Sequence, residues 1–501
     1  MKLMSTALLP ENIYRQLSDR CAQANASLLE TLDSWSLVQV DRFTSSGRNY
    51  LGEEATLWAL RPALTLGCYE PWREATVAQK TLALETRLHV RGTHSKHAYL
   101  EQLGEDARAA LAALPHPPLV AAWYETSEIR SLVDGLGGKL LTAKREVREI
   151  VEDKSRLNEL LASAGIEAGL QIASIRVEGR APAFNELANR LGLPLVVQVN
   201  SSGGRGTLFV SNEQDFTDAL ALGRPLRISE FVPGFSSNTT VLTIANGKGC
   251  QVYVDQPSHK AMHVREVGIG NAKGAGNDWS IPFEYEGVNA LVESAVRLGE
   301  YLFETYGLVG LWGIDTIWNG NQVVINEINC RNQGTTEVSG INQILRGVPP
   351  FVVSHLALHA GTPVSWLPNP DQYNAQTIQG ASHPSGLRPF YLKIRNRMNL
   401  PVVTSPDLPS SGVYRLEATE QLKWLHPAGC TYEANFDENE VLVANLPGAA
   451  TLCLPGAELC TLEGLTTNRS IFDGPYSLSP YGEMLTRAIY KHFIPDPDWR
   501  S

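Results

Sequence analysis

Apolar positions along the first part of this chain follow the patterns of alternating strands and helices. Short apolar runs at 36–40 and 118–123 predict buried strands. Residues 157–164 carry apolar side chains at helical spacing, and residues 288–305 repeat that pattern over a longer stretch. From about residue 376 the sequence changes to short apolar runs separated by prolines and glycines, which predicts a β-rich region.

These patterns predict an α/β (α+β) protein in three parts. We expect an N-terminal α/β domain over residues 1–150, a central α/β domain over 151–375 and a small β-rich domain over 376–501. A chain of 501 residues is long enough for several domains, each with its own buried core.

A hairpin is predicted inside the central part. Residues 312–318 and 323–329 are rich in Trp, Ile and Val and flank the turn-forming residues 319–321. A three-residue loop would place Asp315 directly opposite Glu327. The two acids would then lie on one face of the hairpin, because directly opposed residues of paired strands share a face.

Polar residues after the second acid extend this face. Side chains alternate along a strand, so Asn329 and Arg331 lie on the same face as Glu327. Opposed carboxylates destabilise a hairpin unless a cation offsets them, and Mg²⁺ is usually held by one or two carboxylates with phosphates completing its shell. We therefore predict Asp315, Glu327 and Asn329 as ligands of Mg²⁺, with Mn²⁺ as an alternative. A hairpin with solvated surface acids is the competing interpretation.

The run Glu327-Ile328-Asn329-Cys330-Arg331, preceded by Asp315 and followed by Gln333-Gly334-Thr335-Thr336, resembles the metal-binding signature of the ATP-grasp superfamily. The resemblance covers residues 151–375 and implies an ATP-grasp core between a pre-ATP-grasp domain and a C-terminal β-rich domain. It implies a ligase in which ATP phosphorylates a substrate carboxylate and an amine then displaces phosphate to form an amide. Arg331 would hold the carboxylate and stabilise the oxyanion.

Three further segments fall in the order that this superfamily uses and are expected to bind ATP. They are the helix start at Lys154, the strand 193–198 with the glycine-rich loop 201–207, and the hinge 228–234, which would grip adenine. Glycines let backbone N–H groups close around phosphate oxygens. The residues implied are Lys154, Gln198, Ser202, Gly203, Gly204, Gly206, Thr207, Glu230, Phe231 and Val232.

Two positions depart from the family pattern. Gln198 stands where the family usually carries Lys, and the run 235–238 lacks the Glu that often binds ribose. Arg205, or a basic residue within 259–265, is a candidate to supply the missing positive charge. The residues expected to act at the γ-phosphate or the substrate are Arg331, Arg265 and Lys260.

Charge and composition narrow the class of partner. The net charge of −11 and the pI near 5.6 argue against a broad electrostatic grip on nucleic acid or on an anionic membrane. No apolar run approaches the roughly 18 residues needed to span a bilayer. The apolar stretch near the N-terminus is too short for a signal peptide. We expect a cytoplasmic protein, a homodimer by default, whose partners are small-molecule carboxylates and amines.

Two alternatives remain at this stage. A non-catalytic nucleotide-binding protein would explain Gln198, although the paired acids would then serve no purpose. A biotin-carboxylase-like enzyme would share the core, but the chain has no biotinyl-acceptor sequence, and residues 333–336 lack the acid-bearing run of carboxylases. We expect Thr335, Thr336 and Glu337 to line the substrate pocket.

Overall fold

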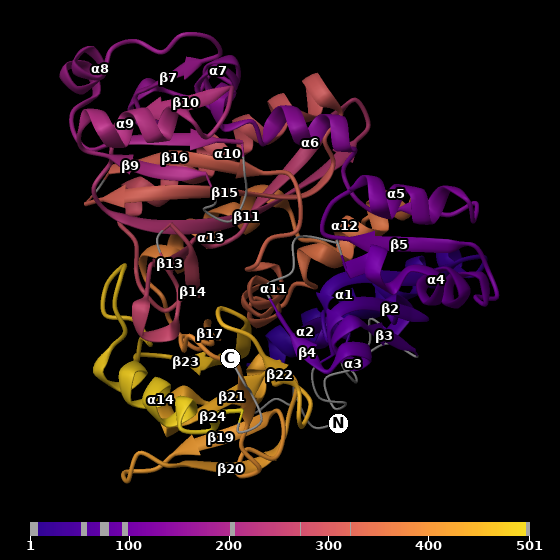
Figure 1. Cartoon of the computed structure of the whole chain (residues 1–501). Coiled ribbons are helices and arrows are strands. Elements are labelled where there is room, and N and C mark those ends of the chain that lie inside the picture. Colours follow the sequence, from indigo (N-terminus) through magenta and orange to yellow (C-terminus); the bar gives the residue numbers. More distant parts are fainter. Residues whose placement is uncertain are drawn as a thin grey trace.

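The computed structural model describes residues 9–51, 58–70, 80–92, 99–200, 206–270, 272–320 and 322–496. Within these ranges the strands form four sheets, arranged in three regions of the molecule (Figure 1). Ser202, Gly203 and Gly204, which were predicted to bind phosphate, lie outside the described residues, as does Arg205.

The N-terminal region is built on a parallel sheet with the strand order β3-β2-β1-β5-β6. Its strands are β1 (Ser36–Phe43), β2 (Leu64–Tyr69), β3 (Thr81–Ala83), β5 (Pro118–Ala122) and β6 (Lys139–Leu140). The helices are α1 (Glu11–Leu32), α2 (Arg48–Leu51), η1 (Trp58–Leu60), α3 (Leu84–Leu88), α4 (Tyr99–Ala112) and α5 (Ser127–Asp134). Buried apolar residues such as Val38 and Val120 pack against α4. Both predicted strands, 36–40 and 118–123, are therefore confirmed.

A small antiparallel sheet, β7-β10-β8-β9, begins the central region. It contains β7 (Ser174–Val177), β8 (Leu195–Val199), β9 (Thr207–Val210) and β10 (Leu226–Ser229), with α8 (Phe184–Leu191) and α9 (Glu213–Leu220). Val197 pairs with Ile228, and both pack against the two helices. Gln198 pairs with Arg227, so alternation places these two polar residues on the opposite face of the sheet. Figure 1 shows the small sheet stacked over β15 and β16.

The largest sheet crosses from the central into the C-terminal region, with the order β16-β15-β11-β13-β14-β17-β23-β21-β19-β20 and β12 paired to β11. Its central strands are β11 (Phe235–Asn246), β12 (Gly249–Val254), β13 (Ser258–Met262), β14 (Gly274–Asp278), β15 (Gly310–Asn319) and β16 (Gln322–Asn329). Its C-terminal strands are β17 (Arg388–Arg395), β19 (Gly412–Leu416), β20 (Leu422–Pro427), β21 (Glu440–Ala444) and β23 (Glu458–Thr466). Because β14 pairs with β17, the sheet continues across the domain boundary that was predicted near residue 375.

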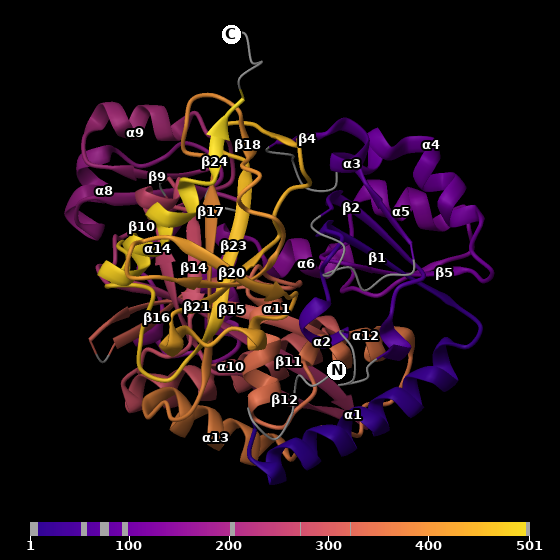
Figure 2. The same cartoon turned by 90° about the horizontal axis from the view of Figure 1, so that it is seen from below.

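Helices connect the central sheet to its surroundings. They are α6 (Arg145–Val151), η3 (Lys154–Arg156), α7 (Leu157–Ser163), η4 (Ala168–Leu170), η5 (Arg265–Val267), α10 (Tyr285–Tyr306), α11 (Thr336–Leu345), α12 (Phe351–Ala360) and α13 (Pro370–Ser382). The long helix predicted over 288–305 is α10, which packs with α13 against β11 and β12. The helices α11 and α12 belong to a different apolar core, which includes α1. Figure 2 shows α1 beside α12.

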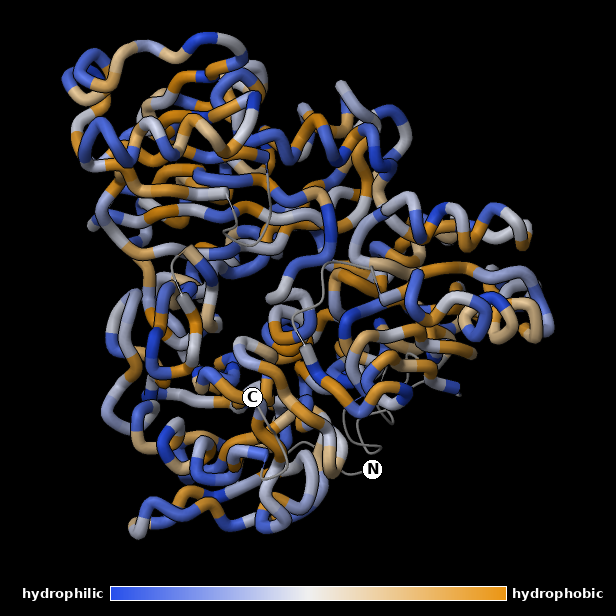
Figure 3. The backbone as a smooth tube through the Cα atoms, viewed as in Figure 1, coloured by the Kyte–Doolittle hydropathy of each residue, from blue (hydrophilic) through white to orange (hydrophobic). Residues whose placement is uncertain are grey.

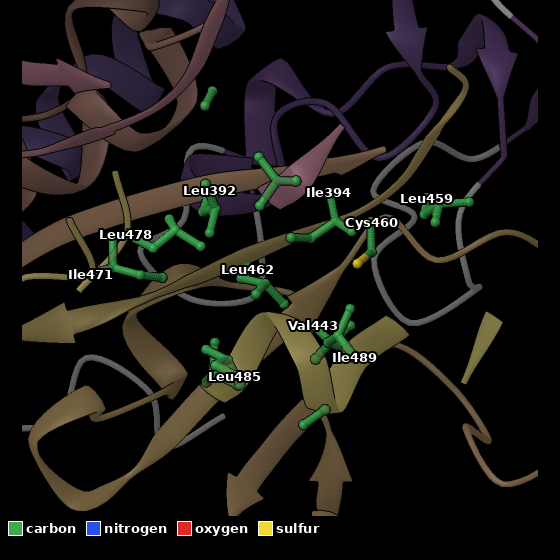
Figure 4. Packing of buried hydrophobic residues seen from close by; sticks show 14 of the residues in the cluster. Leu392, Ile394, Val443, Leu459, Cys460, Leu462, Ile471, Leu478, Leu485 and Ile489 are labelled. Carbon is green, nitrogen blue, oxygen red and sulfur yellow. The ribbon is translucent and has the colours of Figure 1, made fainter. Parts of the chain in front are cut away.

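The C-terminal region has its own apolar core. Leu392 and Ile394 of β17 meet Leu462 of β23 beneath α14 (Pro480–Tyr490), which contributes Leu485 (Figure 4). The remaining elements are η6 (Thr431–Glu433), η7 (Phe436–Glu438) and the small sheet of β24 (Phe493–Pro495), β18 (Val402–Thr404), β22 (Leu452–Cys453) and β4 (Val90–Arg91). This last sheet ties the C-terminal region to the N-terminal one, because β22 pairs with β4.

Apolar residues follow the strands of all three regions (Figure 3), in line with the buried cores. No helix in the described part of the chain is long and apolar enough to cross a membrane.

Candidate active site

The predicted hairpin is formed by β15 and β16, and its register places the two acids as expected. Asp315 pairs directly with Glu327. The predicted three-residue loop is wrong, because Asn319 pairs with Gln322 and only two residues remain in the turn. A bulge on β16 at Asn326 adds one residue to that strand and restores the opposition of the acids.

Each acid of the pair lies against a lysine that the sequence had placed in a separate segment. Lys260 Nζ of β13 is 2.8 Å from Asp315 Oδ2, and Lys154 Nζ of η3 is 3.3 Å from Glu327 Oε2. Burial by itself would raise the pKa of Asp315, but the Lys260 ammonium outweighs it and the pKa is lowered. The four side chains therefore form a charge-compensated cluster. Lys154 is buried in this cluster and is not a solvated residue of a helix start.

The donor set fits Mg²⁺. Two carboxylates face one another across the hairpin, and the amide of Asn329, which is buried, follows on β16. Mg²⁺ takes oxygen ligands and is commonly held by only one or two carboxylates, with water and phosphate oxygens supplying the rest. Across the described ranges, no cluster of three or more His, Cys, Asp or Glu side chains could hold a metal ion. The amide oxygen is therefore an integral part of the predicted site.

Arg331 is fixed at the end of this hairpin by three polar contacts, one of which runs from Nη1 to the Asn332 carbonyl at 3.1 Å. Its Nη2 donates to Asn329 Oδ1 at 2.6 Å, and its Nε lies 3.1 Å from Glu152 Oε1, just after α6. Arg148 approaches the other oxygen of Glu152 at 3.6 Å. The guanidinium is thereby held beside the predicted metal ligand. Cys330, the residue before it, is fully buried in the central core, as alternation predicts.

The predicted adenine hinge directly follows β10. Glu230 is bound to Ala173 through its backbone N–H at 3.0 Å and its Oε1 at 2.9 Å. Phe231 is exposed and meets Phe209 edge-on, with ring centroids 5.9 Å apart. Val232 is half-buried. These contacts fix the course of the hinge and leave an apolar ring exposed beside it.

The phosphate-loop side of the site contains a cation that the sequence analysis missed. Gln198 Nε2 donates to Thr207 Oγ1 at 3.3 Å, and Gly206 begins the return of the chain toward β9. Opposite Gln198 lies Arg227, only 1% exposed, whose Nη1 donates to the Asn326 carbonyl at 3.1 Å. In the sequence, Arg227 could have been recognised as a charged residue between two apolar residues in a strand that runs into the hinge.

Two of the basic residues predicted to supply the positive charge that is missing at position 198 have other contacts. Lys260 is bound to Asp315. Arg265 is exposed on η5, where its Nε lies 3.0 Å from His263 Nε2. His259 stacks on Phe235 at 4.2 Å between centroids, and burial lowers the pKa of its imidazole to about 4. His259 is therefore neutral at physiological pH.

A cavity of about 130 Å³, partly open to solvent, lies where the three regions meet and is lined by residues that follow the hairpin. Asn332, Gln333 and Gly334, the residues directly after Arg331, line it. Thr336 and Glu337 also line the cavity, as predicted. Thr335 does not; its hydroxyl donates to Asn238 Oδ1 at 2.8 Å.

The wall of the cavity combines apolar surface with charged groups of both signs. The cavity is lined by Asp41 and Arg42 from the N-terminal region, Glu337 from the central region, and Lys393 and Glu463 from the C-terminal region. Burial raises the pKa of Glu337 to about 7 and lowers that of Lys393 to about 8. Lys393, another residue missed in the sequence, lies so close to Gly334 that a Cβ there would be 3.3 Å from its Nζ.

The raised pKa of Glu337 predicts a pH-dependent stability difference. Because the folded state favours the protonated carboxyl, the contribution of Glu337 to the free energy of unfolding is full below its pKa in the unfolded chain. This contribution is lost as pH rises through about 7. Glu337→Gln, which is always neutral, should therefore gain stability relative to wild type between pH 5 and pH 8, by about 1–3 kcal/mol. Urea unfolding across this range measures the difference. Glu286→Gln, which changes an exposed carboxylate, is the control. If the stability of Glu337→Gln changed with pH in the same way as that of wild type, the burial argument would be contradicted.

Comparison with known proteins agrees with this geometry. The sequence model of the ATP-grasp domain matches residues 164–342. Two similar proteins are formate-dependent phosphoribosylglycinamide formyltransferases. The one from Methanocaldococcus jannaschii is 22% identical, over 60% of this chain and 72% of the relative. The one from Prochlorococcus marinus (strain MIT 9303) is 24% identical, over 60% of this chain and 71% of the relative.

Solved structures show the same fold. Phosphoribosylamine–glycine ligase from Thermotoga maritima aligns with a TM-score of 0.50 at 13% identity, over 92% of this chain and 97% of that one. Biotin carboxylase from Campylobacter jejuni aligns with a TM-score of 0.50 at 14% identity, over 91% and 86%. Residues 164–342 of this chain form an ATP-grasp domain. The protein is an enzyme with an ATP-grasp domain.

Proposed function

We propose that this enzyme is an ATP-dependent carboxylate–amine ligase that forms an amide through an acyl-phosphate and releases ADP and phosphate. One observation carries the proposal: the acid pair leads along the chain, through Arg331, directly into the lining of a cavity that carries charged groups of both signs. The cavity is the site proposed for the carboxylate and the amine, and the acid pair is the site proposed for the phosphates of ATP.

Phosphoryl transfer mainly needs positioning and neutralisation of charge. When bound by Asp315, Glu327 and Asn329, Mg²⁺ would neutralise charge on the β- and γ-phosphates. Lys154 and Lys260 already lie within 3.3 Å and 2.8 Å of the two acids and would add positive charge on either side of the phosphates.

The cavity suits the second half of the reaction. Arg331 would hold the acceptor carboxylate by its guanidinium and would stabilise the oxyanion that develops when the amine attacks. An amine must lose a proton to become a nucleophile, and a carboxyl with a pKa of about 7, as in Glu337, is matched to accept it at neutral pH. Lys393 adds a cation that can meet a substrate carboxylate.

The relatives support a carboxylate as one substrate, since their name describes them as formate-dependent, and formate is a carboxylate. The division of the chain fits this assignment. The central region would hold the nucleotide, while residues 1–150 and 376–501 would each supply one wall of the cavity.

Release of phosphate and ADP from ATP tests the proposal. The purified enzyme with Mg²⁺ is screened against carboxylic acids paired with amines, and the amide is identified by mass spectrometry. Phosphate release that requires both partners, with one amide formed per ADP, supports the ligase. Turnover that requires bicarbonate and no amine would contradict it and indicate a carboxylase.

A further inference from the structure

Arg227 is a buried cation with unused hydrogen-bonding capacity. Arg227 is 1% exposed, and its Nη1 donates to the Asn326 carbonyl and, at 3.5 Å, to Gln198 Oε1. Counting partners in the described part of the chain, Nε and Nη2 have no acceptor. A buried guanidinium without an anionic partner is costly, and burial lowers its pKa to about 10. Such a group is suited to an anion that arrives from outside the chain.

The position of Arg227 shows where that anion would lie. Val197 and Ile228 face the helices of the small sheet, so Arg227 and its cross-strand partner Gln198 face the large sheet. Its contact with Asn326 spans the gap between the two sheets, one residue before Glu327. Along the chain, β10 continues into the hinge at residue 230. Arg227 therefore lies between the proposed adenine site and the acid pair, where a nucleotide's phosphates would pass.

The neighbouring cations have other partners. Lys154 and Lys260 lie against Glu327 and Asp315, and Arg265 lies at the surface beside His263. Gln198 is neutral, and Arg227 is its direct partner on β10. Arg176, opposite Arg227 on β7, shares this face but lies 2.6 Å from Glu178 and 3.8 Å from Glu159. Because directly opposed residues in paired strands have Cβ atoms about 4.5–5.5 Å apart, a cation on β10 can serve the same space as one on β8.

We propose that Arg227 binds the phosphates of ATP and replaces, from the neighbouring strand, the lysine that this chain lacks at position 198. The inference rests on the proposed nucleotide site but not on the amide-forming reaction. Its guanidinium would use Nε and Nη2, the two nitrogens without partners, as a bidentate donor to phosphate oxygens.

Binding of ADP and of adenosine, measured by calorimetry without turnover, tests the proposal. Arg227→Gln should weaken ADP about 10- to 100-fold, the effect of losing charge-assisted hydrogen bonds, and leave adenosine unchanged. Arg224→Gln is the matched control: this exposed arginine precedes β10 and donates only to backbone carbonyls, so ADP binding should not change.

A charge relocation separates a phosphate contact from a structural role. Gln198→Lys in the Arg227→Gln background should restore most of the ADP affinity, because it returns a cation to the same face from the opposite strand. If Arg227 only supports the bulge at Asn326, then Arg227→Gln will weaken adenosine and ADP equally and Gln198→Lys will not rescue. Arg227→Lys keeps the charge and should retain most of the ADP affinity; this variant also tests the proposal if Arg227→Gln fails to fold. If Arg227→Lys lowered the affinities for ADP and for adenosine by the same factor, the proposal would be overturned.

The outcome is distinguishable from failure of the proposed reaction. If wild type does not bind ADP, the nucleotide site itself is wrong. If wild type and Arg227→Gln bind ADP equally, only the role of Arg227 is wrong. If Arg227→Gln selectively loses ADP but no substrate pair supports turnover, the nucleotide contact stands and the ligase assignment fails.

Discussion

Glu327→Gln is expected to reduce ATP-dependent turnover by about 1000-fold or more. A metal ion supplies several kcal/mol of charge stabilisation to phosphoryl transfer, and the amide keeps the shape of Glu327 but loses its charge. The fold should survive, because the side chain is partly exposed and the amide oxygen of Gln can still accept a hydrogen bond from Lys154. Phosphate release at increasing Mg²⁺ concentration measures the effect.

The control for Glu327→Gln is another carboxylate on the same large sheet. Glu440 of β21 forms an ion pair with Arg415 at the surface of the C-terminal region, so Glu440→Gln should leave turnover unchanged. Matching unfolding curves for both variants would exclude a folding defect. If Glu327→Gln kept more than a tenth of wild-type turnover at saturating Mg²⁺, the metal assignment would be wrong.

Arg331→Lys is expected to lower kcat/KM for the carboxylate substrate by about 100- to 1000-fold. The planar guanidinium contacts Glu152, Asn329 and the Asn332 carbonyl together, and a Lys side chain cannot reproduce these three contacts. An ammonium is a single point charge and would lose both the orientation and the oxyanion contact. Steady-state kinetics with each substrate varied in turn measures the loss.

The separate KM values identify what Arg331 does. The KM for ATP should change little, because the contacts of Arg331 lie beside the cavity and not in the hinge. Arg297→Lys, at an exposed helix surface, is the neutral control. A loss confined to the KM for ATP would show that Arg331 serves the nucleotide and not the carboxylate.

The hairpin and the opposition of its two acids were predicted correctly from the sequence. The length of its loop was not. The bulge at Asn326 leaves no mark in the pattern of apolar residues, yet it shifts the strand by one position and brings Glu327 opposite Asp315. The correct register thus came from an incorrect loop, and only the backbone pairing distinguishes the two.

The positions of cations on strands that are distant in sequence were harder to predict. Gln198 and Arg227 pair through β8 and β10, although β9 and a helix separate these strands along the chain. Lys393 reaches the cavity only because β17 joins β14 across what the sequence presented as a domain boundary. Spacing along one segment predicts contacts within a hairpin, but it carries no information about which remote strands become neighbours.

The continuity of the large sheet has an evolutionary consequence. The acid pair lies on β15 and β16, at one end of the strand order, while β17 and β23 lie several strands away and supply Lys393 and Glu463 to the cavity. Substitutions in the C-terminal strands can therefore change which molecule is admitted while the phosphate chemistry stays intact. Diversification of substrates within one catalytic framework would accumulate in those strands first.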